Sequence, residues 1–278
     1  MEVRTSPGTP SPWQGERAIV TTPWHDTPQA CAHAQALAAW FACAYVPRRR
    51  RSIARLCEEE AASVVIVAET MPKLYHARAP EEPLFFHPGT AQTRLVAVDR
   101  GQGDRLLRVA RVRPGDVVVD ATLGRGLDAL VLAAGVGPHG RVIGLESSWA
   151  LYRLFAYAKA HPGGAFPHLR ALWPRIEPVW AEHTAWLARQ PADSVDVVYF
   201  DPMFQRPLVG GTSIDAARAF TNPSPLAAAA FAEAQRVARR CVVVKERPQS
   251  TVWEQLGLVP DKPRAPFAFG VWWKEAVE

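Results

Sequence analysis

Short runs of β-branched and apolar residues alternate with longer amphipathic segments through the second half of the chain. Five runs predict strands: 117–122, 141–146, 177–182, 194–201 and 241–246. Three segments between them predict helices: 126–137, 149–161 and 224–240. Strands that alternate with helices imply a mostly parallel sheet covered on both faces, and right-handed crossovers make such a sheet doubly wound. The pattern therefore predicts an α/β fold.

The first third of the chain repeats this alternation on a smaller scale. Strands are predicted there at 18–23 and 63–69, and helices at 27–44 and 52–60. Thr27 is a suitable N-cap for the first helix, with Pro28 at its first position. These elements predict a small α/β subdomain.

The remaining segments suggest how the chain is organised. Residues 1–16 are rich in proline and poor in apolar residues, so we expect them to be disordered. Residues 81–98 are expected to join the two parts. The predicted organisation is a tail at 1–16, a subdomain at 17–85 and a larger domain at 86–278.

Composition excludes several classes of protein. With 48% hydrophobic and 21% charged residues among 278, the chain is typical of a soluble globular protein. We expect no signal peptide, because the start is polar, and the apolar runs are too short or interrupted to span a bilayer. The four cysteines form no C-x-x-C pair and the eight histidines no H-E-x-x-H, so we expect a cytoplasmic protein with reduced thiols and no metal.

The net charge of +5 permits a polyanionic partner without establishing one. The densest cluster of positive charge is a run of four arginines, Arg48, Arg49, Arg50 and Arg51. Such a run could bind RNA phosphates, or it could be a solvated loop before a helix. Composition leaves both interpretations open.

A glycine turn follows the predicted strand at 117–122. Asp120 ends that strand, and Gly124 and Gly126 lie in the turn before the next helix, where glycine allows a ligand close to the backbone. Glu146 ends the next strand, twenty positions after Gly126, where a carboxylate can accept from ribose hydroxyls. The turn could also be an ordinary one without a ligand.

The charge of the turn distinguishes between cofactors. Asp120 precedes the glycines and Asp128 follows them, so a pyrophosphate there would be repelled. Two carboxylates suit the ammonium and sulfonium charges of S-adenosylmethionine. Glu182 and His183 end the third strand, where adenine contacts are expected, although alone such residues are usually just exposed.

The strand at 194–201 ends in the sequence Asp-Pro-Met-Phe. Pro202 disfavours helical geometry at Asp201, which would hold Asp201 oxygens toward the cofactor's methyl group. Acceptors on the N–H groups of an aryl amine make its nitrogen more nucleophilic and hold it in line. Phe204 could stack on the base that carries the amine. We therefore predict that Asp201, Pro202 and Phe204 are catalytic; the alternative is a strand-ending turn with Phe204 in the core.

Four stretches carry a family resemblance: 100–112, 117–133, 197–204 and 241–248. In order and approximate spacing they resemble the ribosomal RNA small-subunit methyltransferase J (YhiQ-like) family, and the first third resembles a Gram-positive branch of it. The resemblance implies a Rossmann-like class I methyltransferase with a seven-stranded sheet and S-adenosylmethionine as cofactor. It also implies transfer to N2 of a guanine in 16S rRNA, with RNA or the 30S subunit as partner. By the same resemblance the cofactor contacts are Leu127, Asp128, Glu146, Ser147, Glu182, His183 and Asp201.

Three other functions remain open at this point. The acceptor could be another amine in RNA, a small molecule or a protein, and nothing in the sequence separates these from guanine in rRNA. A non-catalytic RNA-binding or assembly factor could keep the fold, which the intact Asp201-Pro202 argues against. The acids around the glycine turn argue against a nicotinamide-dependent oxidoreductase.

Overall fold

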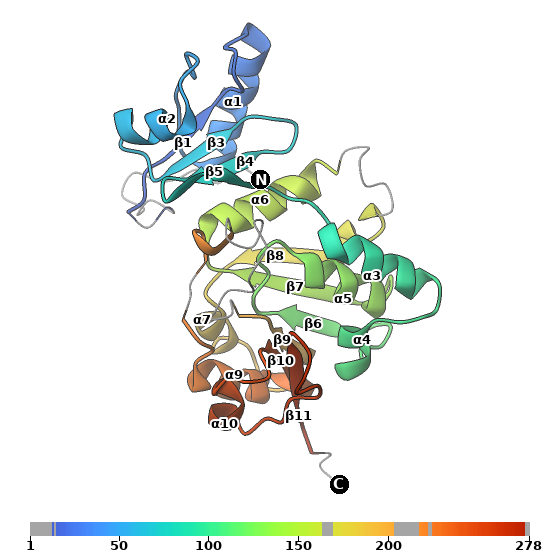
Figure 1. Ribbon diagram of the computed structural model, residues 1–278. Helices are drawn as coiled ribbons and strands as arrows, with labels where there is room; N and C mark the ends of the chain where they lie inside the picture. Colours follow the sequence, from blue (N-terminus) through green and yellow to red (C-terminus); the bar gives the residue numbers. More distant parts are fainter. Residues whose placement is uncertain (1–12, 14, 163–168, 203–216, 222–223, 276–278) are drawn as a thin grey trace. The chain divides into compact units, whose positions relative to one another are not determined.

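The computed structural model describes residues 13, 15–162, 169–202, 217–221 and 224–275. The chain divides into two compact units, which are treated separately below. The first comprises Met1–Phe86 with Gly210–Phe220, and the second His87–Val209 with Thr221–Glu278 (Figure 1). Phe204 and most of the tail predicted at 1–16 lie outside the described residues.

The first unit is a small α/β sheet structure. Its described strands run in the order β2-β1-β3-β4-β5, where β1 is parallel to β2 and β3, and β4 is antiparallel to β3 and β5. The strands are β1 (Ala18–Thr21), β2 (Ala44–Tyr45), β3 (Val64–Val67), β4 (Lys73–His76) and β5 (Ala79–Leu84). The helices are α1 (Pro28–Phe41) and α2 (Ile53–Glu59).

Local sequence explains these elements. The residues of β1 and β3 are all buried, as their β-branched runs predict, and Ile19 and Val65 pack on Leu56 of α2. Thr27 caps α1 as predicted, its hydroxyl accepting from the backbone N–H of Ala30 at 3.2 Å. The unit therefore has a short parallel core, to which the β4–β5 hairpin adds an antiparallel edge.

The second unit contains the doubly wound sheet that the sequence predicts. Its order among the described residues is β11-β10-β9-β6-β7-β8, parallel except for β11 against β10. The strands are β6 (Val117–Asp120), β7 (Arg141–Glu146), β8 (Ile176–Trp180), β9 (Val195–Phe200), β10 (Ala238–Glu246) and β11 (Ala268–Trp273). The described sheet thus has six strands, whereas the resemblance implied seven.

Helices cover both faces of this sheet (Figure 1). They are α3 (Gly89–Asp99), α4 (Arg105–Val109), α5 (Leu127–Val136), α6 (Trp149–Ala160), α7 (His183–Leu187), α9 (Ala228–Val237) and α10 (Val252–Leu256). Among them, α5 packs with α3 and α4, and α9 packs with α7 and α10. None of the helices in the described part of the chain is long and apolar enough to cross a membrane.

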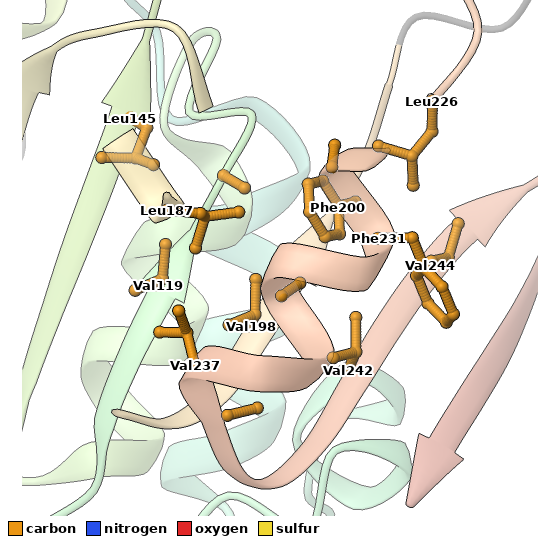
Figure 2. Close-up of a cluster of buried hydrophobic side chains, with 14 of the residues drawn as sticks. Val119, Leu145, Leu187, Val198, Phe200, Leu226, Phe231, Val237, Val242 and Val244 are labelled. Carbon is orange, nitrogen blue, oxygen red and sulfur yellow. The ribbon is translucent and has the colours of Figure 1, made fainter. Parts of the chain in front are cut away.

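The central strands are held by an apolar cluster beneath α9. Figure 2 shows Val119 of β6, Val198 of β9 and Val242 of β10 beside Phe231 and Val237 of the helix. The three strand valines are fully buried. Burial of a valine or phenylalanine side chain contributes about 1.5–3 kcal/mol, so the cluster stabilises the packing of α9 on the central strands.

The chain order makes the ends of β6 and β9 a natural binding position. From β6 the chain winds outward through β7 and β8, and then crosses back to β9 on the other side of β6. In open α/β sheets, ligands bind at the carboxyl ends of the strands where the winding reverses. That position lies between β6 and β9.

Candidate cofactor and acceptor site

Three carboxylates predicted from the sequence lie at this edge of the sheet. Asp120 is the last residue of β6, Glu146 the last residue of β7, and Asp201 directly follows β9. Because β6 is parallel to both neighbours, the three strand ends meet at one edge. Asp120 and Glu146 are buried, at 1% and 8% exposure, and Asp201 is half-buried.

The two glycines of the turn have different roles. Gly126 precedes α5 with φ of +74°, and a Cβ there would lie 2.0 Å from a ring carbon of Phe155 on α6. Gly126 is therefore required by the packing of the turn on α6 as well as by its backbone conformation. Gly124 has φ of +51°, but its Cβ would meet nothing nearer than 3.8 Å, so the backbone there is open to an approaching ligand.

Glu146 ties the glycine turn to the start of α6. Its Oε2 accepts from the backbone N–H of Gly124 at 2.8 Å, and its Oε1 accepts from that of Ser148 at 2.7 Å. Burial raises the pKa of Glu146 to about 7, although these backbone donors oppose the rise. Each carboxylate oxygen can accept a second hydrogen bond, which suits a diol such as the ribose of a nucleoside.

Asp120 is a buried acid in an acidic setting. It accepts one hydrogen bond at 3.2 Å from the backbone N–H of Thr122. Burial, followed by the negative charge of Asp128, raises the pKa of Asp120 well above its ordinary value. A buried carboxyl surrounded by acids is stabilised by a cation, so the site fits a positively charged cofactor better than a pyrophosphate.

Asp128, in the first turn of α5, is already neutralised by the protein. It accepts from Arg94 of α3, from Nζ of Lys245 at 3.2 Å and from the hydroxyl of Tyr199 at 2.8 Å. Burial opposes ionisation, but the cations of Lys245 and Arg94 hold the pKa of Asp128 below its ordinary range. The sequence suggested that both acids around the glycines face the cofactor's charge. In the structure three side chains bond Asp128, whereas no side chain in the described part of the chain bonds Asp120.

Asp201 is fixed through both its backbone and its side chain. Its N–H donates to Oγ1 of Thr122 at 2.6 Å, and its Oδ2 accepts from Nζ of Lys245 at 2.7 Å. Burial raises the pKa of Asp201 to about 6, and Lys245 limits the rise. The paired acids, Asp201 foremost, outweigh burial and raise the pKa of Lys245, which therefore stays protonated.

Sequence reasoning did not identify Lys245, Thr122 or Arg94 as site residues. Lys245 directly follows the apolar run 241–244 near the end of β10, and a lysine beside that buried run was the available signal. Arg94 joins the site through a two-point contact with Asp104, at 2.8 and 3.1 Å, and through its bond to Asp128. These three residues connect Asp120, Asp128 and Asp201 into one network.

The remaining predicted cofactor residues lie around the same edge. Leu127 opens α5 beside Gly126. The backbone oxygen of Ser147 accepts from the indole N–H of Trp180 at 3.1 Å. Glu182 caps α7, accepting from the N–H groups of Thr184 and Ala185 at 2.9 and 2.7 Å, so much of its hydrogen-bonding capacity is used locally.

His183 lies edge-on to Phe200, with ring centroids 5.6 Å apart. Burial lowers the pKa of His183, which favours the neutral imidazole. A neutral, partly apolar ring is compatible with a base such as adenine. Contact of Glu182 or His183 with adenine stays a prediction. Among the described residues, no group of three or more His, Cys, Asp or Glu side chains could hold a metal ion.

The four arginines of the first unit do not act alike. Arg48 is 8% exposed and its Nε donates to the backbone oxygen of Arg51 at 2.6 Å. Arg51 pairs with Glu59 and Glu60 at 3.0 and 2.9 Å. Arg48 and Arg51 therefore stabilise the loop, and of the four only Arg49 and Arg50 are exposed.

The sheet order matches the fold of class I S-adenosylmethionine-dependent methyltransferases, the predicted fold class. A solved S-adenosylmethionine-dependent methyltransferase from Neisseria gonorrhoeae matches the fold with a TM-score of 0.58. The match covers 94% of this chain and 97% of that one, at 17% identity. S-adenosylmethionine, the cofactor predicted from the sequence, is the cofactor of this class.

The chain belongs to the family of the uncharacterized protein YpiP from Bacillus subtilis. The two are 30% identical over 254 residues, which are 91% of this chain and 98% of that protein. Ribosomal RNA small subunit methyltransferase J from Laribacter hongkongensis is 46% identical over 89 residues, 31% of this chain and 30% of that protein. The resemblance to methyltransferase J is therefore confirmed over part of the chain. No protein-family model matches the chain.

Proposed function

We propose that this protein transfers a methyl group from S-adenosylmethionine to the exocyclic N2 amine of a guanine in 16S rRNA. The observation that carries the proposal is the position of Asp201-Pro202 at the end of β9, beside the glycine turn of β6, with the Asp201 carboxylate held by Lys245. The partial identity to a small-subunit rRNA methyltransferase supports RNA as the acceptor. Such an acceptor is found in the cytoplasm, as the 30S subunit or its 16S rRNA.

The acids and glycines of the edge would hold the cofactor. Glu146 would accept from ribose hydroxyls, and Gly124 would allow the cofactor to approach the backbone closely. Burial disfavours the carboxylate form of Asp120, and the positive charge of the cofactor would stabilise that form. Ser147, Glu182 and His183 would lie toward the adenine. Leu127 and Asp128 would contact the cofactor from the start of α5. Bound there, S-adenosylmethionine supplies a methyl group on a positively charged sulfur.

Asp201 would prepare the acceptor. The lone pair of an aryl amine is delocalised into its ring, so the amine attacks poorly unless an acceptor orients its N–H groups. Lys245 bonds Oδ2 of Asp201, and the second carboxylate oxygen would accept from the amine. The bond from the Asp201 N–H to Thr122 fixes the backbone before Pro202, so the acceptor oxygen is placed before the substrate arrives.

Lys245 has a positioning role in this scheme. Its ammonium lies 2.7 Å from Asp201 and 3.2 Å from Asp128, so one cation orients the acceptor carboxylate and neutralises the acid at the start of α5. Because the charge of Lys245 opposes the rise in the pKa of Asp201, it keeps more of Asp201 in the carboxylate form near neutral pH. The proposed stacking of Phe204 on the target base stays a prediction, since Phe204 lies outside the described residues.

Mass spectrometry of rRNA nucleosides from a strain that lacks the gene tests the proposal. The rRNA of the deletion strain should lose N2-methylguanosine at one position of 16S rRNA, and the plasmid-borne gene should restore it. A plasmid carrying Asp201→Ala should fail to restore the modification while producing comparable protein. An unchanged set of methylated nucleosides in the deletion strain would refute rRNA as the acceptor.

A further inference from the structure

The first unit has its own loops at the carboxyl edge of its parallel strands. The loop after β1 carries Trp24 and Asp26 into α1, and the loop after β2 carries the arginine run. Since β1 and β2 are parallel neighbours, both loops leave the sheet at the same edge. Together they line a shallow hollow of about 390 Å³, formed by Trp24, His25, Asp26, Thr27, Arg49 and Arg50.

Asp26 holds the second loop against the first. Its Oδ1 accepts from the backbone N–H of Arg48 at 2.9 Å, and its Oδ2 accepts from that of Arg49 at 2.8 Å. The hydroxyl of Thr22 donates to the same carboxylate. Although burial acts in the opposite direction, these hydrogen bonds lower the pKa of Asp26, so it remains a carboxylate in neutral solution.

The backbone of the arginine loop is strained. Arg49 and Arg50 have φ of 47° and 56°, two consecutive left-handed residues without glycine at either position. Residues other than glycine occupy that region only when their surroundings impose it, and such strain often accompanies function. Here Asp26 supplies the restraint, and it leaves both arginine side chains exposed.

Arg49 and Arg50 differ from their neighbours in charge pairing. Arg51 and Arg55 are paired with acids of α2, whereas within the described part of the chain neither Arg49 nor Arg50 forms an ion pair. The charge of Arg49 helps to lower the pKa of Asp26, but neither guanidinium is held in a salt bridge among the described residues, so both can contact the phosphates of a polyanion.

Trp24 presents an aromatic surface beside these charges. Its side chain is 51% exposed, an unusual state for a tryptophan whose role is packing. The guanidinium carbon of Arg48 lies 5.8 Å from the indole centroid, and Arg48 is itself buried and bonded to Arg51. A fixed cation therefore supports the ring, and the exposed part remains available to another flat group.

We propose that the Trp24 surface, defined as Trp24, Arg49 and Arg50, binds a single-stranded segment of the RNA substrate. An unpaired base stacks on Trp24, and the flanking phosphates contact Arg49 and Arg50, the combination by which proteins bind single-stranded nucleic acids. The proposal rests on RNA being the acceptor. It adds a binding surface in the first unit, apart from the carboxyl edge of the second unit's sheet.

Binding of a fluorescein-labelled single-stranded RNA oligonucleotide of mixed sequence to the full chain tests this surface. Trp24→Leu should weaken binding by about 5- to 100-fold, the loss expected for one stacked base. Arg49→Gln/Arg50→Gln should weaken binding and flatten its salt dependence, with a slope change of about 0.7 for each phosphate that the variant no longer binds. Arg55→Gln is the matched control: Arg55 is exposed in the same unit but paired with Glu59, and its loss should leave the salt slope unchanged.

Calorimetry of S-adenosylmethionine binding, measured for every variant, distinguishes loss of the RNA surface from a general loss of function or folding. All variants should bind the cofactor like the wild type, which shows that the second unit is folded, and should keep the wild-type thermal unfolding curve in circular dichroism, which reports on the first unit as well. Wild-type RNA affinity and salt slope in the Trp24 and Arg49/Arg50 variants would overturn the surface while leaving the proposed function intact. An equal loss in Arg55→Gln would also overturn it, because the effect would be one of net charge. A wild type that binds cofactor but not the oligonucleotide would overturn the surface; the proposed function is tested separately, by the methylated nucleosides of 16S rRNA.

Discussion

The charge of Lys245 gives the most specific prediction about catalysis. Its ammonium lies 2.7 Å from Oδ2 of Asp201 and 3.2 Å from Oδ2 of Asp128. Lys245→Met keeps the aliphatic stem and removes the cation, while Arg94 still pairs with Asp128. The substitution therefore tests the charge that acts on Asp201 with little loss of packing.

The magnitude follows from the titration of Asp201. With its pKa raised to about 6, Asp201 is about nine-tenths ionised at pH 7. An opposite charge at hydrogen-bond distance usually lowers a carboxyl pKa by about 1–3, so removing Lys245 should raise the pKa of Asp201 by that much. The carboxylate form at pH 7, and the rate with it, should then fall by about 2- to 100-fold.

The sign of the effect defines the assay. A raised pKa means that more of Asp201 is protonated at neutral pH. The acid limb of the pH–rate profile should therefore shift to higher pH, and activity should recover as the pH rises. Single-turnover methyl transfer to 16S rRNA, measured across the pH range in which Asp201 titrates, reports this shift. Lys245→Arg keeps the cation and should stay close to the wild-type profile. A Lys245→Met variant with the wild-type acid limb, or with the same fractional loss at every pH, would refute the role of its charge.

Substitutions at four further residues test other parts of the site. Glu146→Ala should weaken S-adenosylmethionine binding by about 1–3 kcal/mol in calorimetry; in the wild type, with its pKa of about 7, affinity should also fall as the pH drops below 7. Unchanged affinity in the variant would exclude Glu146 from the site. Asp201→Ala should lower kcat by about 100-fold or more with little effect on RNA binding, and Asp201→Asn should retain more activity because it keeps an acceptor oxygen. A wild-type rate in Asp201→Ala would contradict this, and inactivity of both variants would favour a general base. Gly126→Ala should lower the free energy of unfolding by about 1–3 kcal/mol, because its Cβ would lie 2.0 Å from a Phe155 ring carbon; Gly124→Ala, whose Cβ meets nothing within 3.8 Å, should cost less, and equal losses would count against the packing argument.

The sheet of the second unit was predictable because its central strands are buried on both faces. Such strands are continuous β-branched runs, as in Val117–Asp120 and Val195–Phe200. The start of β10 was not predictable in the same way. Ala238–Arg240 was predicted to end the helix at 224–240, but the structure places it in β10, where the register shifts before Cys241. Alanine and arginine favour helices, and pairing with β9 overrides that preference.

The segment predicted to join the two parts contains a strand and a helix that the sequence pattern did not predict. β5 has the sequence APEEPL, and prolines and glutamates disfavour a strand, but β5 is an edge strand that, among the described residues, pairs with β4 alone. Helix α3 follows at Gly89–Asp99, where threonine and valine weaken the helical signal. Both elements depend on tertiary contacts that a local pattern does not carry.

The candidate site was predictable to the extent that it depends on strand ends. Asp120, Glu146 and Asp201 each end or follow a parallel strand, so topology alone brings them to one edge. The charge pairs could not be predicted, because Lys245 meets Asp128 across 117 positions and Arg94 meets Asp128 across 34. The folded structure determines which side chains pair over such separations. That pairing in turn determines which acids are left to bind a ligand.

Methyl transfer from radiolabelled S-adenosylmethionine by the purified chain to 30S particles and to free 16S rRNA tests the central claim most directly. After digestion to nucleosides, the label should appear in N2-methylguanosine, at one site per 16S rRNA, and should be absent with Asp201→Ala. A folded chain that binds S-adenosylmethionine but labels neither form of the RNA would contradict the account. Label in a different nucleoside would contradict the assignment of the guanine N2 amine.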